Sequence, residues 1–298
     1  MGRLGVALLV MLAFLAALAG FAWFDAKKQR DEALKKLEQL EAQSAKATQP
    51  ALTPAISPQG ADGLLESLKP LLKVENEEVR ARAVELAAYA EPKGADALLE
   101  QVLRSDKSAK VKVAALDAIG KQKINSCRQQ VLEMLKADDA AVRRKAAWTL
   151  GALGKVAETV ALQDTRASLV AALMAENQAW VDALIKEAER VKMPKKEAAP
   201  VQSGQAFGIL GPYLAALGEI GDAETAKQLE FFMESKDPLV RRETAMALGK
   251  IAAPDSKKIL MEKHKFETDP LAKTAIAGVL SGPGYKLKLD PKTGQFKE

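Results

Sequence analysis

The fold is decided by the stretch VRRKAAWTLG, residues 142–151, which has a close second copy in VRRETAMALG, residues 240–249. Weaker copies of the same order of residue types occur elsewhere in the chain, at residues 79–88, 111–120, 181–190, 209–218 and 272–281. The copies return at a period of about 32 residues, and self-similarity at such a period indicates a repeat architecture. The sequence therefore predicts about seven repeated units.

In register, the copies describe an amphipathic helix. Apolar or small residues recur at the first, fifth, sixth, eighth and ninth places, and charge gathers at the second to fourth places. This spacing gives a helix one apolar stripe. Small residues at the fifth and eighth places, such as Ala146 and Ala247, allow a neighbouring helix to approach closely. The glycines at the tenth place, Gly120, Gly151 and Gly249, are predicted to end their helices in the left-handed conformation.

A second, shorter apolar run at helical spacing precedes each of these helices, as in Leu98, Leu99 and Val102. Two helices are therefore expected to alternate in every unit. Helix start signals lie between the two, and they comprise the N-cap candidates Asn76, Ser108, Asp139 and Asp237 with Pro238 and Pro270 just inside a helix. No stretch alternates with period two, so no strands are expected.

These residues resemble the HEAT and HEAT-like (PBS-lyase-type) repeat family over about residues 62–282. The resemblance implies an all-α fold, an α-solenoid of stacked helical hairpins. It implies little about activity, since the family includes scaffolds, adaptors, bilin-attaching lyase subunits and a metal-dependent hydroxylase. A helix pair cannot bury both apolar faces alone, so stacking on neighbours is also the physical expectation.

Net charge is modest and unevenly placed. The formal value is +5, and the excess lies mainly in residues 26–46, 192–197 and 283–298, which leaves the repeats near neutral. Nucleic acid is not an expected partner, because the repeats lack the basic stripe that phosphate binding needs.

The amino-terminal residues 1–25 read as a transmembrane anchor or signal segment. Residues 4–24 carry no charge and are long enough as a helix to span about 30 Å of hydrocarbon. A cleavage site at Ala17-Leu18-Ala19 is the alternative, but hydrophobicity continues beyond it, which favours an uncleaved single-pass anchor. The short basic start at Arg3 favours an extracytoplasmic, periplasmic solenoid, whereas the basic residues that follow the span favour the cytoplasmic side.

Three further segments flank or interrupt the repeats. Residues 26–43 read as a charged helix with Leu34, Leu37 and Leu40 on one stripe, and residues 44–61 as a proline-rich linker. Residues 191–205 are expected to form an irregular insertion, and residues 283–298 a polar tail.

Residues suited to catalysis are scarce. His264 is the only histidine and Cys127 the only cysteine, which removes the common zinc motifs and the histidine-dependent triads. His264 lies among charged residues and is expected to be solvated, while Cys127 is expected to be a small buried residue. We predict no catalytic residue, metal site, cofactor or small-molecule substrate.

The exposed surface of the repeats offers the candidate site. At the seventh place, Glu85 and Asp117 are replaced by Trp148 and Met246 in the two clearest copies. Arg144 and Arg242 precede these by four residues, so each arginine is expected to lie over its apolar neighbour. We predict partner binding by Arg144, Trp148, Arg242 and Met246, although Trp148 equally suits a seam between repeats.

The basic residues at the second place, Arg80, Lys112, Arg143 and Arg241, are expected to pair with acidic residues of adjacent units. The preferred function is a membrane-anchored adaptor or assembly scaffold that binds other proteins without catalysis of its own. The alternative is a lyase-like or chaperone-like HEAT protein that assists modification of a client protein.

Overall fold

The computed structural model describes residues 62–90, 94–154, 160–190 and 204–297. The chain divides into two units, Met1–Gln59 and Gly60–Glu298, and the described residues all belong to the second. The predicted anchor (1–25), charged helix (26–43) and linker (44–61) lie outside the described residues, as does most of the predicted insertion. Among the helices that are described, none combines the length and apolarity needed to cross a bilayer.

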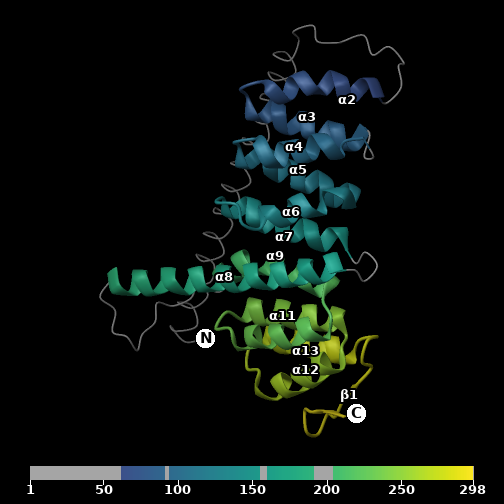
Figure 1. Cartoon of the computed structure of the whole chain (residues 1–298). Coiled ribbons are helices and arrows are strands. Elements are labelled where there is room, and N and C mark those ends of the chain that lie inside the picture. Colours follow the sequence, from purple (N-terminus) through teal and green to yellow (C-terminus); the bar gives the residue numbers. More distant parts are fainter. Residues whose placement is uncertain (1–61, 91–93, 155–159, 191–203, 298) are drawn as a thin grey trace, which may run out of the picture. The chain divides into compact units, whose positions relative to one another are not determined.

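The described helices alternate in six pairs, each with a first (A) and a second (B) helix. The A positions are held by α2 (Asp62–Leu68) with η1 (Lys69–Lys73), α4 (Asp96–Ser105), η2 (Asn125–Cys127) with α6 (Arg128–Met134), α8 (Val160–Arg190), α10 (Ala223–Leu229) with η3 (Glu230–Glu234), and α12 (Pro254–Phe266). The B helices are α3 (Glu77–Ala90), α5 (Ala109–Gln122), α7 (Ala140–Leu153), α9 (Gln205–Ile220), α11 (Pro238–Ile251) and α13 (Pro270–Ser281). Each B helix packs beside the next, in the solenoid arrangement that the periodicity predicts (Figure 1).

The helix starts form as the sequence predicts. Asp139 accepts hydrogen bonds from the backbone N–H groups of Ala141 and Val142 at 2.8 and 3.0 Å. The other predicted caps also accept from their own helix starts, at Asn76, Ser108 and Asp237, and Pro238 and Pro270 occupy the first turn of their helices. These contacts satisfy N–H groups that a helix start leaves free.

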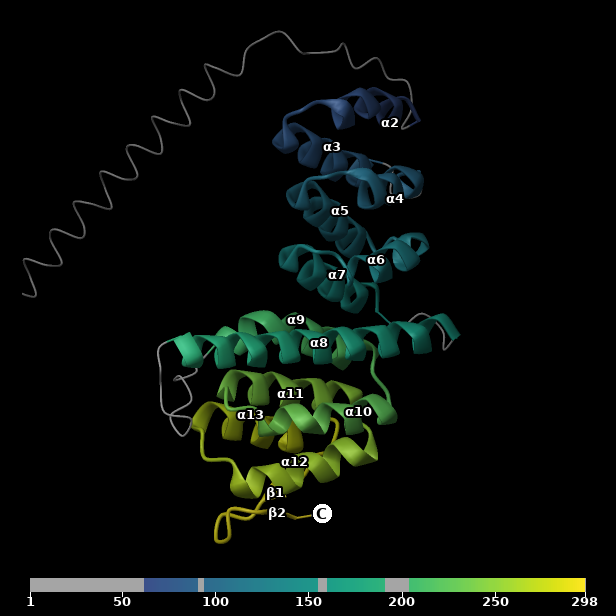
Figure 2. The ribbon, with the colours of Figure 1, turned by 60° about the vertical axis from the view of Figure 1, so that its left-hand side comes forward.

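One predicted repeat does not form a hairpin of its own. Residues 181–190 continue α8, which runs from Val160 to Arg190 and projects beyond its neighbours (Figures 1 and 2). The physical reason is that residues 160–190 contain neither glycine nor proline, so nothing in the sequence interrupts the helix. The described residues therefore form six helical pairs, and the prediction of about seven units is wrong because residues 181–190 do not form a unit of their own.

The tenth-place glycines do not end their helices. The residues with positive φ come three positions later, at Lys123, Gly154 and Ala252. The glycines lie instead where the next B helix packs: Gly120 meets the Trp148 ring, Gly249 meets the Val279 side chain, and a Cβ atom on Gly151 would be 2.8 Å from the Cα atom of Ala216. Their function is close packing, since any side chain would push the two helices apart.

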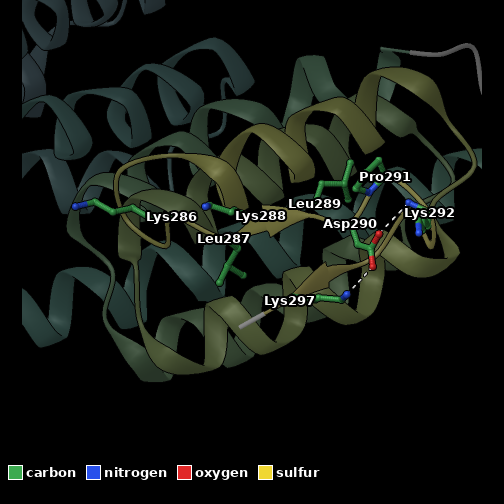
Figure 3. A pocket seen from close by; sticks show the side chains of 8 residues that line it. All are labelled: Lys286, Leu287, Lys288, Leu289, Asp290, Pro291, Lys292 and Lys297. Atoms are coloured by element: carbon green, nitrogen blue, oxygen red, sulfur yellow. Dashed lines mark hydrogen bonds and ion pairs between the residues drawn. The ribbon is translucent and has the colours of Figure 1, made fainter.

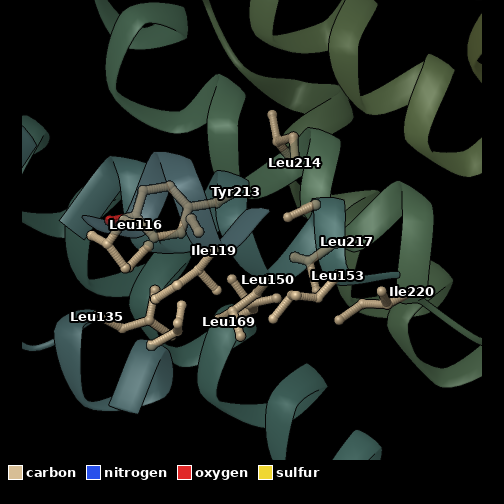
Figure 4. Close-up of a cluster of buried hydrophobic side chains, with 14 of the residues drawn as sticks. Leu116, Ile119, Leu135, Leu150, Leu153, Leu169, Tyr213, Leu214, Leu217 and Ile220 are labelled. Atoms are coloured by element: carbon tan, nitrogen blue, oxygen red, sulfur yellow. The ribbon is translucent and has the colours of Figure 1, made fainter. Parts of the chain in front are cut away.

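The core is continuous along the stack and is filled mainly by leucine, alanine and valine. Around α5, α7 and α9 it gathers the fully buried Leu116, Leu150 and Tyr213 (Figure 4). The Tyr213 hydroxyl donates a hydrogen bond to Glu176 Oε1 at 3.2 Å. Cys127 is also fully buried, as predicted, and burial raises the pKa of its thiol to about 12.

The tail departs from the all-α expectation. Strands β1 (Lys288–Leu289) and β2 (Phe296–Lys297) pair antiparallel, with Leu289 opposite Phe296. Phe296 packs edge-on against His264, with ring centroids 5.0 Å apart, and leaves His264 only 4% exposed. The prediction of a solvated His264 is wrong, because the tail covers it. Two-residue strands are too short to show an alternating pattern.

Candidate docking surface

The seventh-place residues of the B helices follow one another along the stack, and we call this set the seventh-place ridge: Glu85, Asp117, Trp148, Ala215, Met246 and Gly278. Trp148 is 38% exposed and Met246 41% exposed, and both are among the large apolar side chains that the fold leaves open. Between them, α9 contributes the smaller Ala215. The ridge therefore presents two large apolar groups on α7 and α11, two helices that flank the same neighbour.

Trp148 has two roles in this arrangement. Its ring lies over Gly120 of α5, where a Cβ atom would come within 2.6 Å of the ring, so one part of the side chain covers the seam between two B helices. Lys145 Nζ lies 4.2 Å from the centroid of the ring. Trp148 thus contacts Gly120 on the neighbouring helix α5 and Lys145 on its own helix α7.

The cation over Trp148 is Lys145 rather than the predicted Arg144. The charge of Arg144 acts instead on Tyr213 of α9, where it opposes the effect of burial on the pKa of the tyrosine. Lys145, three residues before Trp148, holds the position over the ring that was expected for Arg144. Partner binding by Arg144 stays a prediction.

The second predicted pair lies on α11. Met246 is exposed, and Arg242 is partly exposed with Nη2 4.0 Å from Glu243 Oε2. Arg242 Nε is buried and has no hydrogen-bond partner within the described structure. The two residues share one stripe of the helix, so α11 offers an apolar group beside a cation whose charge is only loosely paired.

Ion pairs surround Trp148. Lys145 Nζ contacts Asp117 Oδ1 at 2.6 Å, and Lys121 Nζ contacts Asp117 Oδ2 at 2.6 Å. Burial alone would raise the pKa of Asp117, but hydrogen bonds from Lys121 and Lys145 bring it below its usual value. The pairing of Lys145 with Asp117 was not predicted from the sequence. The contact between Lys145 and Asp117 joins residues 28 positions apart on two helices, so no local pattern indicates it. The contact between Asp117 and Lys121, four residues apart on one helix, does follow a local rule.

Comparison with known families identifies the repeat family to which these helical pairs belong. A family model described as HEAT repeats matches residues 95–188 and 213–281, which is more than half of the chain. The chain belongs to the HEAT-repeat family. Two engineered proteins of known structure are similar to it. One is 18% identical with a TM-score of 0.42 over 74% of this chain and 96% of its own, and the other is 20% identical with a TM-score of 0.44 over 73% and 99%. No curated protein matches.

The second-place arginines of this HEAT array join neighbouring units, as predicted. Arg241 forms a two-pronged contact with Glu267, with both N–O distances 2.8 Å, and also donates to the Ser235 carbonyl at 2.7 Å. Arg80 pairs in the same way with Asp106, and Arg143 Nε donates to Glu176 Oε1 at 2.6 Å. Because these guanidinium groups are committed within the fold, they are unsuited to binding a partner.

The hollows of the HEAT array offer little for chemistry. The larger, about 700 Å³, opens beside the tail hairpin and is lined chiefly by lysine and leucine side chains (Figure 3). The other, about 290 Å³, lies where η2 and α6 meet the start of α8. Within the described ranges, no three His, Cys, Asp or Glu side chains gather as metal ligands would.

Proposed function

We propose that this HEAT-repeat chain is a membrane-anchored adaptor or assembly scaffold that binds another protein along the seventh-place ridge and catalyses no reaction itself. The observation that carries the proposal is the exposure of Trp148 and Met246 at a place where α3 and α5 have acidic residues. Partly exposed aromatic and methionine side chains beside arginine are typical of protein interfaces. HEAT repeats generally supply such extended binding surfaces.

The surroundings of the two residues support this. Lys121 and Lys145 are paired with Asp117 on one side of the ridge, and Lys250 pairs with Glu219 further along. With these charges satisfied, burying Trp148 and Met246 under a partner removes apolar surface from water without stranding a charge. Arg144 and Arg242 beside them favour a partner that carries acidic groups around an apolar centre.

Residues 4–24 support the membrane part of the proposal, through their length and lack of charge. We propose that they form an uncleaved anchor and that the repeats face the extracytoplasmic side. A reporter enzyme that is active only outside the cytoplasm, fused after residue 298, tests the orientation. Activity of the fusion is expected, while an inactive but membrane-bound fusion would place the repeats in the cytoplasm.

A photo-crosslinking residue placed at Met246 tests the docking surface. The matched control is the same residue at Gln228, which is exposed on α10 in the same repeat. A discrete adduct with another protein is expected from position 246 and not from position 228. Equal adducts at both positions, or none at either, would contradict binding along the ridge.

A further inference from the structure

The first B helix exposes a face that the later B helices bury. Contacts along the stack identify this face: Thr149, at the eighth place of α7, donates to the Leu116 carbonyl of the preceding α5 at 2.9 Å. Gly218 of α9 likewise meets Ala247, the eighth-place residue of α11. The eighth place therefore points toward the preceding unit. In α5, α7, α9 and α11 the eighth-place residue is buried, and so is the first-place residue of α5, α7 and α11.

On α3 the equivalent residues are open. Val79 is 36% exposed at the first place and Leu86 55% exposed at the eighth, and Tyr89, one turn further, is 68% exposed. Arg82 lies between them on the same stripe, since the spacings are three, four and three residues. We call these four residues, Val79, Arg82, Leu86 and Tyr89, the α3 end face.

The residue sizes show that this face is not simply a truncated array. The eighth place holds alanine or threonine in α5, α7, α9 and α11, and valine in α13, where Val279 lies against Gly249 of the preceding helix. Leu86 of α3 is larger than all of these. An occupant of the α3 end face therefore meets it through bulkier apolar contacts than those that join the described B helices.

We propose that the occupant is a second copy of this chain, packed through α3 about a two-fold axis. Antiparallel pairing with the axis near the middle of the stripe places Val79 opposite Tyr89 of the second copy. Arg82 and Glu85 form an exposed pair at 2.7 Å within one helix. The same axis brings Arg82 of each copy to within about one residue's rise of Glu85 of the other, so Arg82 on the face and Glu85 at its edge are complementary in charge across the axis.

The opposite end of the stack explains why this contact closes as a dimer. The tail hairpin covers part of the last repeat there, with Phe296 packed on His264, while Phe266 and Leu271 stay exposed. A head-to-tail chain of copies would need that end open. Four residues from each copy make a small interface, below the roughly 1,200 Å² of stable complexes, so the dimer is expected to be reversible and concentration-dependent.

Sedimentation velocity of the full chain in density-matched detergent, over a range of concentrations, tests the proposal. The unmodified chain is expected to show a reversible dimer. Leu86→Lys should weaken it about tenfold or more, because the same axis places residue 86 opposite Arg82 of the other copy, where a second cation replaces an apolar contact by like-charge repulsion. Gln228→Lys, on exposed α10, should leave it unchanged.

A charge exchange distinguishes a second copy from any other occupant. Arg82→Glu alone should weaken the dimer, and adding Glu85→Arg should restore it, because both copies change together. Circular dichroism checks that each variant keeps its helices, which the exposure of Arg82 and Glu85 favours. A monomer at every concentration, a dimer insensitive to Leu86→Lys, or a failure of the double exchange to restore pairing would each overturn the proposal.

Discussion

Replacing Gly151 by alanine tests whether the tenth-place glycines pack helices together. The added Cβ atom would lie 2.8 Å from Ala216 Cα and 3.0 Å from Ala216 Cβ, whereas carbon atoms ordinarily meet at about 3.5–4.0 Å. Helices α7 and α9 must separate to accept it. Overpacking of this kind costs about 1–3 kcal/mol, and the better helix propensity of alanine returns about 1 kcal/mol. We expect net destabilisation of up to about 2 kcal/mol.

Gly208 provides the matched control. It also lies within a helix, α9, but a Cβ atom there meets nothing within 4 Å. Gly208→Ala should therefore stabilise the chain by about 0.5–1 kcal/mol, through helix propensity alone. Urea denaturation followed by circular dichroism measures both variants, and a change of 1 kcal/mol corresponds to about 2–4 °C in the melting temperature for a body of this size.

The two substitutions should thus have opposite signs. Combining Gly151→Ala with Ala216→Gly should recover part of the loss, which a double-mutant cycle reports as an interaction between α7 and α9. Stabilisation by Gly151→Ala equal to that by Gly208→Ala would refute the close-packing argument. So would strict additivity with Ala216→Gly.

Three further expectations follow from buried polar groups. Arg241→Met leaves the Glu267 carboxylate buried without its partner and should lower the free energy of unfolding, measured by urea denaturation, by about 2–4 kcal/mol. Adding Glu267→Gln should recover part of this loss. A loss near zero would show that the pair does not stabilise the fold. Burial, aided by the charge of Lys273, lowers the pKa of His264, so the unfolded chain binds the proton more tightly and stability should fall as pH drops below about 6.5. An NMR titration midpoint for this single histidine at or above that value would contradict its burial. Cys127, with a pKa of about 12, should react with maleimide only when the chain opens, so fast labelling in native buffer would be inconsistent with the packing.

The repeat pattern was enough to predict the helical pairs, because each pair obeys local rules. The period, the apolar stripe and the caps at Asp139 and Asp237 are all readable within one unit. The same local reading misplaced residues 181–190. Apolar spacing shows which face a helix buries, whereas the absence of glycine and proline from residues 160–190 was the signal that α8 continues to Arg190.

Contacts between units were less predictable. Gly151 suits a helix end by residue type, but its role depends on Ala216, a residue 65 positions later that no local pattern connects to it. Lys145 rather than Arg144 lies over the ring of Trp148, and positions three and four residues before the ring are both its neighbours on a helix, so spacing alone does not choose between them. His264 is buried by a tail whose strands are too short to leave a sequence signal.

The affinity of a partner for the ridge is the most direct measure of the docking account. The protein captured by crosslinking at position 246 serves as the titrant in isothermal titration calorimetry. Its affinity is measured for the unmodified chain, for the Met246→Ser variant and for the control variant Gln228→Ser. Met246→Ser is expected to weaken binding about fivefold to thirtyfold, the range of an interface anchor worth 1–2 kcal/mol, while Gln228→Ser leaves it unchanged. An equal affinity of all three proteins would contradict docking at the seventh-place ridge.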